Sequence, residues 1–420
     1  MTLNKIKFTT ILFVFLMGTY SHCQNIKLID SVGIPIRFPS VVYSAWVNGN
    51  ANYIFLIDEN YSLNTYDYSG KKSSLHLDTA FAKKLQYYAS KRLSFNVLTY
   101  INSYHNGFAI KVYDTFFLLD SNLIVQNKYG YKRPKFTNTV FPMYNRKLFL
   151  SDKNKQLITF MGFTTAPIGG METRKTKVMR NINTFLTCSL SDSTKSYSIT
   201  KYWGRYDTIY HKRLLPYLIR RCDADINMDF TNLYSSQAAT HAIELWDIQH
   251  QQLIRRFGVP AKHFNPEYHT PVAWNKKIDN SRKLDYSPFM QKSIECTVYE
   301  GIEYDDAHRL LFRTYSIGKK DTVRHHIKTK EEWKAYKKKN KKLCSSELPE
   351  VWENQIKLYQ SKQYGLQIYN EKQELVYDEI MPTPFNILKI ENDEIWVHGK
   401  YDEVTEKYWI YKYTIELPKP

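Results

Sequence analysis

The sequence predicts an all-β fold whose sheets are covered on both faces. The chain has 420 residues, including 34 Tyr, 22 Phe and 8 Trp, and aromatic residues are enriched in strands. Apolar runs such as Ile54–Ile57 and Phe116–Leu119 show little alternation with polar residues, which indicates strands buried on both faces. Long helical periodicity is nearly absent between residues 24 and 327. The composition excludes a disordered, a collagenous or a polytopic membrane protein.

A hairpin motif recurs along the chain. An apolar run stops at an Asp, and an apolar residue follows about five positions later, as in Leu119-Asp120 followed by Val125. Asp suits this corner because its side chain can hydrogen-bond the backbone two residues further on. The corners stand at Asp58, Asp120, Asp152, Asp192, Asp247, Asp305 and Asn370.

The spacing of these corners predicts a β-propeller of six or seven four-stranded blades. Successive corners lie 32 to 65 residues apart, close to the length of one blade with insertions. Seven corners indicate seven blades, whereas six would result if the 32-residue gap from Asp120 to Asp152 joined two hairpins of one blade. We expect residues 24–420 to form this single domain, with Ile26–Ile29 completing the last blade. A pair of β-sandwiches or a β-helix is the alternative, although no linker and no short repeat supports either.

Residues 328–360 differ from the rest and predict a helical, basic insertion in a late blade. Thr329 and Glu332 form a capping box, and Trp352, Ile356 and Tyr359 share one helical stripe. Residues 328–342 contain eight Lys and two Glu. Such a segment suits an anionic lipid surface, an acidic polysaccharide or a nucleic acid, or it is a solvated helix face.

The first 23 residues predict a secretory signal peptide. Lys5 and Lys7 precede the short apolar run of residues 11–17, and a cut before Gln24 leaves small residues at the required positions. Alternatives are an N-terminal membrane anchor, a buried strand, or a lipoprotein anchored at Cys23, which the residues at 20 and 22 disfavour. We therefore expect export to the periplasm or cell surface of a Gram-negative bacterium.

Four cysteines remain after this cleavage: Cys188, Cys222, Cys296 and Cys344. In an oxidising compartment they form two disulfides, in one of three connectivities, or else they are four isolated thiols. No two of them have the spacing of a metal or redox motif, and we expect no cofactor and no metal.

One stretch resembles known propellers. His241–Asp247 leads to Leu253–Gly258, which is similar to blades of NHL and TolB-like propellers, where a strand ends in a short Arg-Phe-Gly phrase. Residues 259–263 replace the glycine-rich loop that follows in those families. The architecture resembles secreted bacterial six- or seven-bladed propeller families of unknown function. This resemblance implies ligand or partner binding more than catalysis, and it supplies no catalytic residue.

Two arginines are candidate ligand-binding residues. Arg220 and Arg221 precede Asp223 and Asp225, and Arg offers planar, bidentate contacts to carboxylate or phosphate. The binding hypothesis places these residues at a loop rim facing an anionic ligand. The alternative is an ion pair within the loop, which contributes little on a surface.

Three further candidates lie in the next connection. His263 and His269 flank Glu267 in a Pro-containing stretch, and this spacing matches no known metal site. The alternative is a surface loop between blades. Trp274 has a side chain that can stack on a sugar ring, although an all-β chain also buries many aromatics.

These features favour an exported, non-enzymatic protein that binds a ligand or protein partner through channel-mouth loops. The alternative is a polysaccharide-active lyase or hydrolase, whose catalytic residues the sequence does not identify. The net charge of +18 favours an anionic glycan or another cell-envelope partner, and the Lys-rich segment suits contact with a membrane surface. We expect a monomer that does not bind nucleic acid, because the leader directs it out of the cytoplasm.

Overall fold

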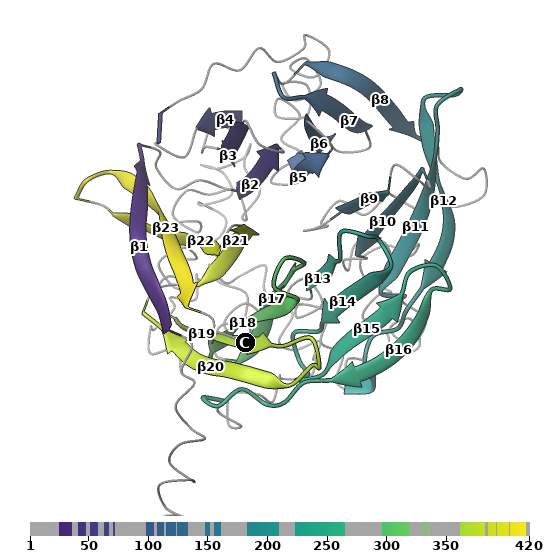
Figure 1. Cartoon of the computed structure of the whole chain (residues 1–420). Coiled ribbons are helices and arrows are strands. Elements are labelled where there is room, and N and C mark those ends of the chain that lie inside the picture. Colours follow the sequence, from purple (N-terminus) through teal and green to yellow (C-terminus); the bar gives the residue numbers. More distant parts are fainter. Residues whose placement is uncertain are drawn as a thin grey trace, which may run out of the picture.

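The computed structural model is built almost entirely of β-strands (Figure 1). It describes residues 25–35, 41–47, 51–57, 63–66, 70–71, 98–104, 107–112, 115–122, 124–132, 148–151, 155–160, 183–209, 223–264, 296–318, 331, 335, 362–382, 385–391, 393–402 and 404–416. Within these ranges, helical backbone occurs at residues 208, 209, 331 and 335. Of the expected helical insertion 328–360, the structure describes Glu331 and Ala335, so this prediction lies almost wholly outside the described residues.

The strands form consecutive antiparallel meanders. The first three groups are β2 (Val41–Val47), β3 (Ala51–Ile57) and β4 (Leu63–Tyr66); β5 (Leu98–Tyr104), β6 (Gly107–Val112), β7 (Thr115–Asp120) and β8 (Val125–Tyr131); and β9 (Leu148–Ser151), β10 (Gln156–Phe160), β11 (Phe185–Ser191) and β12 (Ser196–Trp203). The outer strands β8 and β12 pair in parallel, which joins the second and third groups into one eight-stranded sheet.

The remaining groups continue in the same way. They are β13 (Asp223–Ile226), β14 (Asn232–Ser236), β15 (Ile243–Asp247) and β16 (Gln252–Phe257); β17 (Val298–Asp305), β18 (Leu310–Ile317), β19 (Gln363–Tyr369) and β20 (Leu375–Met381); and β21 (Asn386–Glu391), β22 (Glu394–Asp402) and β23 (Lys407–Glu416), to which β1 (Asn25–Ile34) is added. In Figure 1 the groups follow one another around a ring in chain order.

The ring arrangement confirms the prediction of an all-β, propeller-like fold. The first strand of one group contacts the first strand of a neighbouring group: β2 contacts β5 and β21, and β17 contacts β13 and β21. Inner strands can meet in this way only if the sheets radiate from a common centre. The purple β1 lies beside the yellow β23 in Figure 1 and pairs with it from Asn25 opposite Glu416 to Ile34 opposite Tyr408. The predicted pairing of Ile26–Ile29 with the last sheet is thus confirmed.

The described Asp corners act as the sequence predicts, while Asp58 and Asp152 lie outside the described residues. Asp120 accepts hydrogen bonds on one carboxylate oxygen from the amides of Asn122 and Ile124, both at 2.9 Å. At Lys195, Gln251 and Arg309, the residue just before the second strand of the hairpin has a positive φ. The Asp side chain satisfies the turn amides, and the left-handed residue redirects the chain into the second strand.

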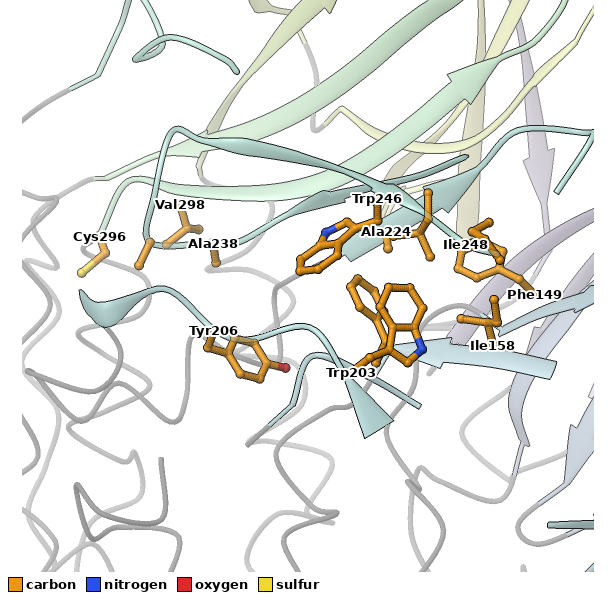
Figure 2. Close-up of a cluster of buried hydrophobic side chains, with 13 residues drawn as sticks. Phe149, Ile158, Trp203, Tyr206, Ala224, Ala238, Trp246, Ile248, Cys296 and Val298 are labelled. Atoms are coloured by element: carbon orange, nitrogen blue, oxygen red, sulfur yellow. The ribbon is translucent and has the colours of Figure 1, made fainter. Parts of the chain in front are cut away.

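The core lies between sheets, as the weak alternation of the strands predicts. All side chains from Thr115 to Leu119 in β7 and from Leu310 to Ser316 in β18 are buried, whereas the outer strand β16 is exposed along most of its length. Figure 2 shows one such interface, where Trp203 of β12 faces Trp246 of β15 with ring centroids 5.7 Å apart. Each sheet therefore buries both faces against its neighbours, and apolar side chains are required on both.

The cysteines do not form two disulfides. Cys188 is a free thiol buried between β11 and the neighbouring strands, and burial raises its pKa. With Cys188 unpaired, each of the three two-disulfide connectivities is excluded. Cys296 is buried in the cluster of Figure 2, and Cys222 and Cys344 lie outside the described residues.

Candidate functional site on the loop face

The connections between strands divide into two classes according to the end of the sheets at which they lie. In an antiparallel meander, the first and third connections lie at one end, and the second lies at the other end together with the link to the next sheet. From β5 to β22, no connection at the first end exceeds five residues. We call this end the turn face and the opposite end the loop face. Connections 132–147, 161–184, 204–222, 258–297 and 318–362 all lie at the loop face.

Contacts between neighbouring sheets show that they share one orientation. The outer strands β8 and β12 run parallel, which aligns the second and third groups. Asp207, just after β12, donates its amide to the side chain of Gln237 in the β14–β15 connection at 2.8 Å. His308 in the β17–β18 turn lies 2.7 Å from Asp393 in the β21–β22 turn. The long connections of these sheets therefore emerge on the same side of the ring.

A contact between two inner strands shows that their sheets also share this orientation. Asp223 and Asp225 of β13 accept hydrogen bonds from the amides of Ile302 (3.2 Å) and Tyr304 (2.7 Å) on the free edge of β17. Both residue numbers increase together, so the two strands run parallel. The two carboxylates lie in a strand and not at a loop rim, which corrects the sequence interpretation. They satisfy edge amides that have no strand partner on that side.

The two longest connections begin and end side by side on the sheet of β17–β20. The amide of Gly318, where connection 318–362 begins, donates to the hydroxyl of Thr297, where connection 258–297 ends, at 3.0 Å. At the other end of 318–362, the buried Lys362 donates to Ser316 at 3.1 Å, and Ser316 donates to Glu300 at 2.8 Å. These buried polar contacts are costly to leave unmade, so they fix both connections at their bases.

The start of connection 258–297 is held by a buried arginine on β18. The Arg313 guanidinium donates to the carbonyl oxygens of His241 (2.6 Å) and Val259 (3.1 Å) and to Tyr369 (3.0 Å). It also donates twice to the side-chain oxygen of Gln367, and its carbon lies 4.1 Å from the centre of the Tyr299 ring. These hydrogen bonds all go to neutral acceptors, and the aromatic face supplies part of the charge compensation.

A carboxylate on β20 completes this arrangement. Asp378 accepts hydrogen bonds from the amide of Lys262 (2.7 Å), from Gln367 (2.8 Å) and from the hydroxyl of Tyr315 (2.8 Å). Burial raises the pKa of the Tyr315 phenol, and the neighbouring Asp378 carboxylate raises it further. Tyr315 therefore remains a proton donor to Asp378 at physiological pH. Residues 258–264 are thus bound to the next sheet by both backbone and side chain.

Of the five predicted site residues, one is described. His263 lies in this bound segment, with its Nε2 3.8 Å from Glu379, while Lys262 pairs with the same carboxylate at 2.6 Å. Arg220, Arg221, His269 and Trp274 lie outside the described residues. They belong to connections 204–222 and 258–297, both of which start and end on the loop face.

Sequence reasoning missed the residues that hold the segment in place. Arg313 is the one charged residue in the apolar run Leu310–Ile317, and that isolation was the available signal. A lone charge in a buried strand requires specific partners. Gln367 and Asp378 carry no such signal, because their roles depend on strands that are distant in sequence.

Within the described part of the chain, no cluster of three or more His, Cys, Asp or Glu side chains has the arrangement of a metal site. The same part of the chain contains no helix of the length and apolarity needed to cross a bilayer.

No family model and no curated protein sequence matches the chain. Among solved structures, it is similar to a member of the DUF4221 family from Bacteroides vulgatus, with a TM-score of 0.55 and 11% identity over 94% of this chain and 99% of that one. It is also similar to a luciferin-regenerating enzyme, with a TM-score of 0.41 and 9% identity over 93% of this chain and 95% of that one. A protein of unknown function from Bacteroides caccae is similar as well, with a TM-score of 0.37 and 7% identity over 81% of this chain and 82% of that one. The first likeness supports the fold alone, and the other two are too distant to carry an argument.

Proposed function

We propose that this chain is an exported, non-enzymatic protein that binds a partner with its loop face. The observation that carries the proposal is the confinement of every connection longer than ten residues between β5 and β23 to one end of the sheets. The links between sheets must lie at this end, because each runs from an outer strand to the next inner strand. Connections 161–184 and 318–362 join neighbouring strands of one sheet, however, and are far longer than a hairpin needs. Loops held by a rigid scaffold are a common basis for recognition.

The way these connections are fixed supports the same proposal. Bonds from Arg313 and Asp378 hold residues 258–264, and the Thr297–Gly318 bond joins the bases of two connections. Fixing the bases limits the conformational entropy that a loop loses when it binds.

We propose an anionic glycan of the cell envelope as the partner. Connection 318–362 contains the lysine run of residues 328–342, and the whole chain has a net charge of +18. Clustered cationic side chains attract an acidic polymer over about one Debye length. The proposed signal peptide, residues 1–23, would deliver the protein to the compartment where such polymers occur.

We also infer that the propeller has six blades. The strands fall into five groups of four and one group of three, when β1 is counted with β21–β23 and the eight-stranded sheet is counted as two groups. The seven corners are therefore not distributed one to a blade. Hairpins β9–β10 and β11–β12 share one blade, Asp305 and Asn370 share the sheet of β17–β20, and the last sheet contains none of the seven.

A loop replacement tests the binding proposal. Ile317 pairs with Gln363, so residues 319–361 can be replaced by Asn-Gly without disturbing the β18–β19 ladder. Binding to polygalacturonate, measured by isothermal titration, is expected to fall at least about tenfold and to weaken with added salt. Neutral dextran should not bind either protein.

The matched control is the same replacement at residues 162–183, where Phe160 pairs with Phe185. This variant should retain most of the affinity, because the connection carries fewer positive charges. An equal loss of affinity in both variants would disprove recognition by the lysine-rich connection. Unchanged affinity after replacement of residues 319–361 would disprove it as well. Release of new reducing ends from the polymer would show an enzyme instead.

A further inference from the structure

The first strand closes the ring and joins its two ends. β1 pairs with β23 along its full length, although the two strands stand at opposite ends of the sequence. Val32 and Ile34 of β1 are buried in a cluster with Tyr408 and Ile410 of β23, and Tyr66 of the first sheet belongs to the same cluster. β1 therefore completes the last sheet and also packs against the first, as Figure 1 shows at the junction of purple and yellow strands.

The two halves of β1 are held very differently. In the first half, Leu28 is 52% exposed and Ile29 is 49% exposed, and the pairing with β23 is irregular at Ile29. In the second half, Val32 and Ile34 are buried. The outer edge of β1 has no strand partner among the described residues. The first half of β1 therefore has few buried side chains, and such a segment opens at lower free energy than the whole domain.

One glycine governs the fit of the buried half. A Cβ added at Gly33 would lie 3.0 Å from the Trp409 ring and 2.9 Å from the Lys407 side chain. The Trp409 ring thus lies against the backbone of β1, and a side chain at position 33 would force the ring and the Lys407 side chain to shift. Ser31, two positions away on the same strand, is exposed and offers a matched site for a control substitution.

We propose that β1 is a detachable clasp: it leaves the edge of β23 while the other sheets stay folded, and the vacated edge accepts β1 of a second copy. The partner is a second copy because that strand already fits the edge in register and in packing. An exchanged dimer repeats every contact that β1 makes within one chain, so exchange costs little beyond the opening itself. This proposal does not depend on the loop face or on its ligand.

Engineered cysteines test the exchange in the full chain. Lys27 faces Thr414 across the two strands, and facing residues on antiparallel strands are close enough for a disulfide. One copy carries Lys27→Cys and the other carries Thr414→Cys, and the two are mixed under mild oxidation. We expect a disulfide between copies that joins positions 27 and 414, identified by mass spectrometry, in a species with the mass of a dimer.

Two further proteins make the result decisive. The double variant Lys27→Cys/Thr414→Cys should close within one chain, which shows that the register permits the bond. Adding Gly33→Val to the copy with Lys27→Cys should increase the rate of disulfide formation between copies by about tenfold or more. Adding Ser31→Val instead should leave this rate unchanged, because only the change at position 33 shifts Trp409. If the double variant closes but the mixed single variants form no bond, even with Gly33→Val, β1 is a fixed strand and the proposal is wrong.

Discussion

Replacing Arg313 with Met tests whether one buried guanidinium fixes the start of connection 258–297. Met has a similar length and no charge, so the change removes the hydrogen bonds and largely keeps the volume. The carbonyl oxygens of His241 and Val259 and the side-chain oxygen of Gln367 each lose a donor. An unsatisfied buried acceptor costs about 1–3 kcal/mol. Part of this loss is offset because the guanidinium is no longer desolvated, which leaves an expected loss of about 3 kcal/mol in the free energy of unfolding.

The assay is urea unfolding followed by tryptophan fluorescence. The midpoint should fall at an unchanged m-value, because the surface exposed on unfolding hardly changes. Arg255→Met on the exposed strand β16 is the control and should change stability by less than about 0.5 kcal/mol. Limited proteolysis should cut the Arg313→Met protein first within residues 258–264. Equal stability of the two variants would refute the view that these hydrogen bonds hold the connection.

Three other substitutions have defined expectations. Gly365→Ala should destabilise the protein by about 3 kcal/mol, since the new Cβ would lie 2.0 Å from the Tyr315 ring, whereas Gly130→Ala, which meets no atom within 4 Å, should be nearly neutral in the same urea assay. Burial lowers the pKa of Lys389 to about 7, so the unfolded chain binds more protons than the folded one between about pH 7 and 10.5. The free energy of unfolding of the wild type should therefore rise over this pH window. At pH 6 the Lys389→Met variant should be more stable than the wild type by over about 1 kcal/mol, and at pH 10 this advantage should be smaller. The same advantage at both pH values would contradict a lowered pKa for Lys389. Trp246→Ala should lower the free energy of unfolding by about 3–5 kcal/mol, because it leaves a cavity in the cluster of Figure 2. It should also reduce the near-ultraviolet circular dichroism.

Local features of the fold were readable from the sequence. The corner at Asp120 depends on bonds to residues two and four positions away, so the residues that specify it are adjacent in the chain. The weak alternation of Phe116–Leu119 likewise reports burial on both faces without any knowledge of what covers them. The pairing of Ile26–Ile29 with the last sheet followed from the need to close a ring.

Less of the candidate site could be predicted from the sequence. Arg220, Arg221, His263, His269 and Trp274 were chosen for their chemistry, and the single one described, His263, lies in a segment whose position depends on remote partners. Whether a connection belongs to the turn face or the loop face depends on its place in the order of strands. A misjudged strand would reverse the assignment of everything after it, so residue chemistry alone could not assign it.

The sequence by itself determined the class of the fold, its hairpin turns and its basic character, because these depend on neighbouring residues and on composition. The tertiary structure decided which strands lie innermost, that Asp223 and Asp225 bond the edge of β17, and that Arg313 reaches carbonyl oxygens 54 and 72 residues away. Such contacts bring together groups that are far apart in the chain. Their energies depend on distances that only the assembled sheets define.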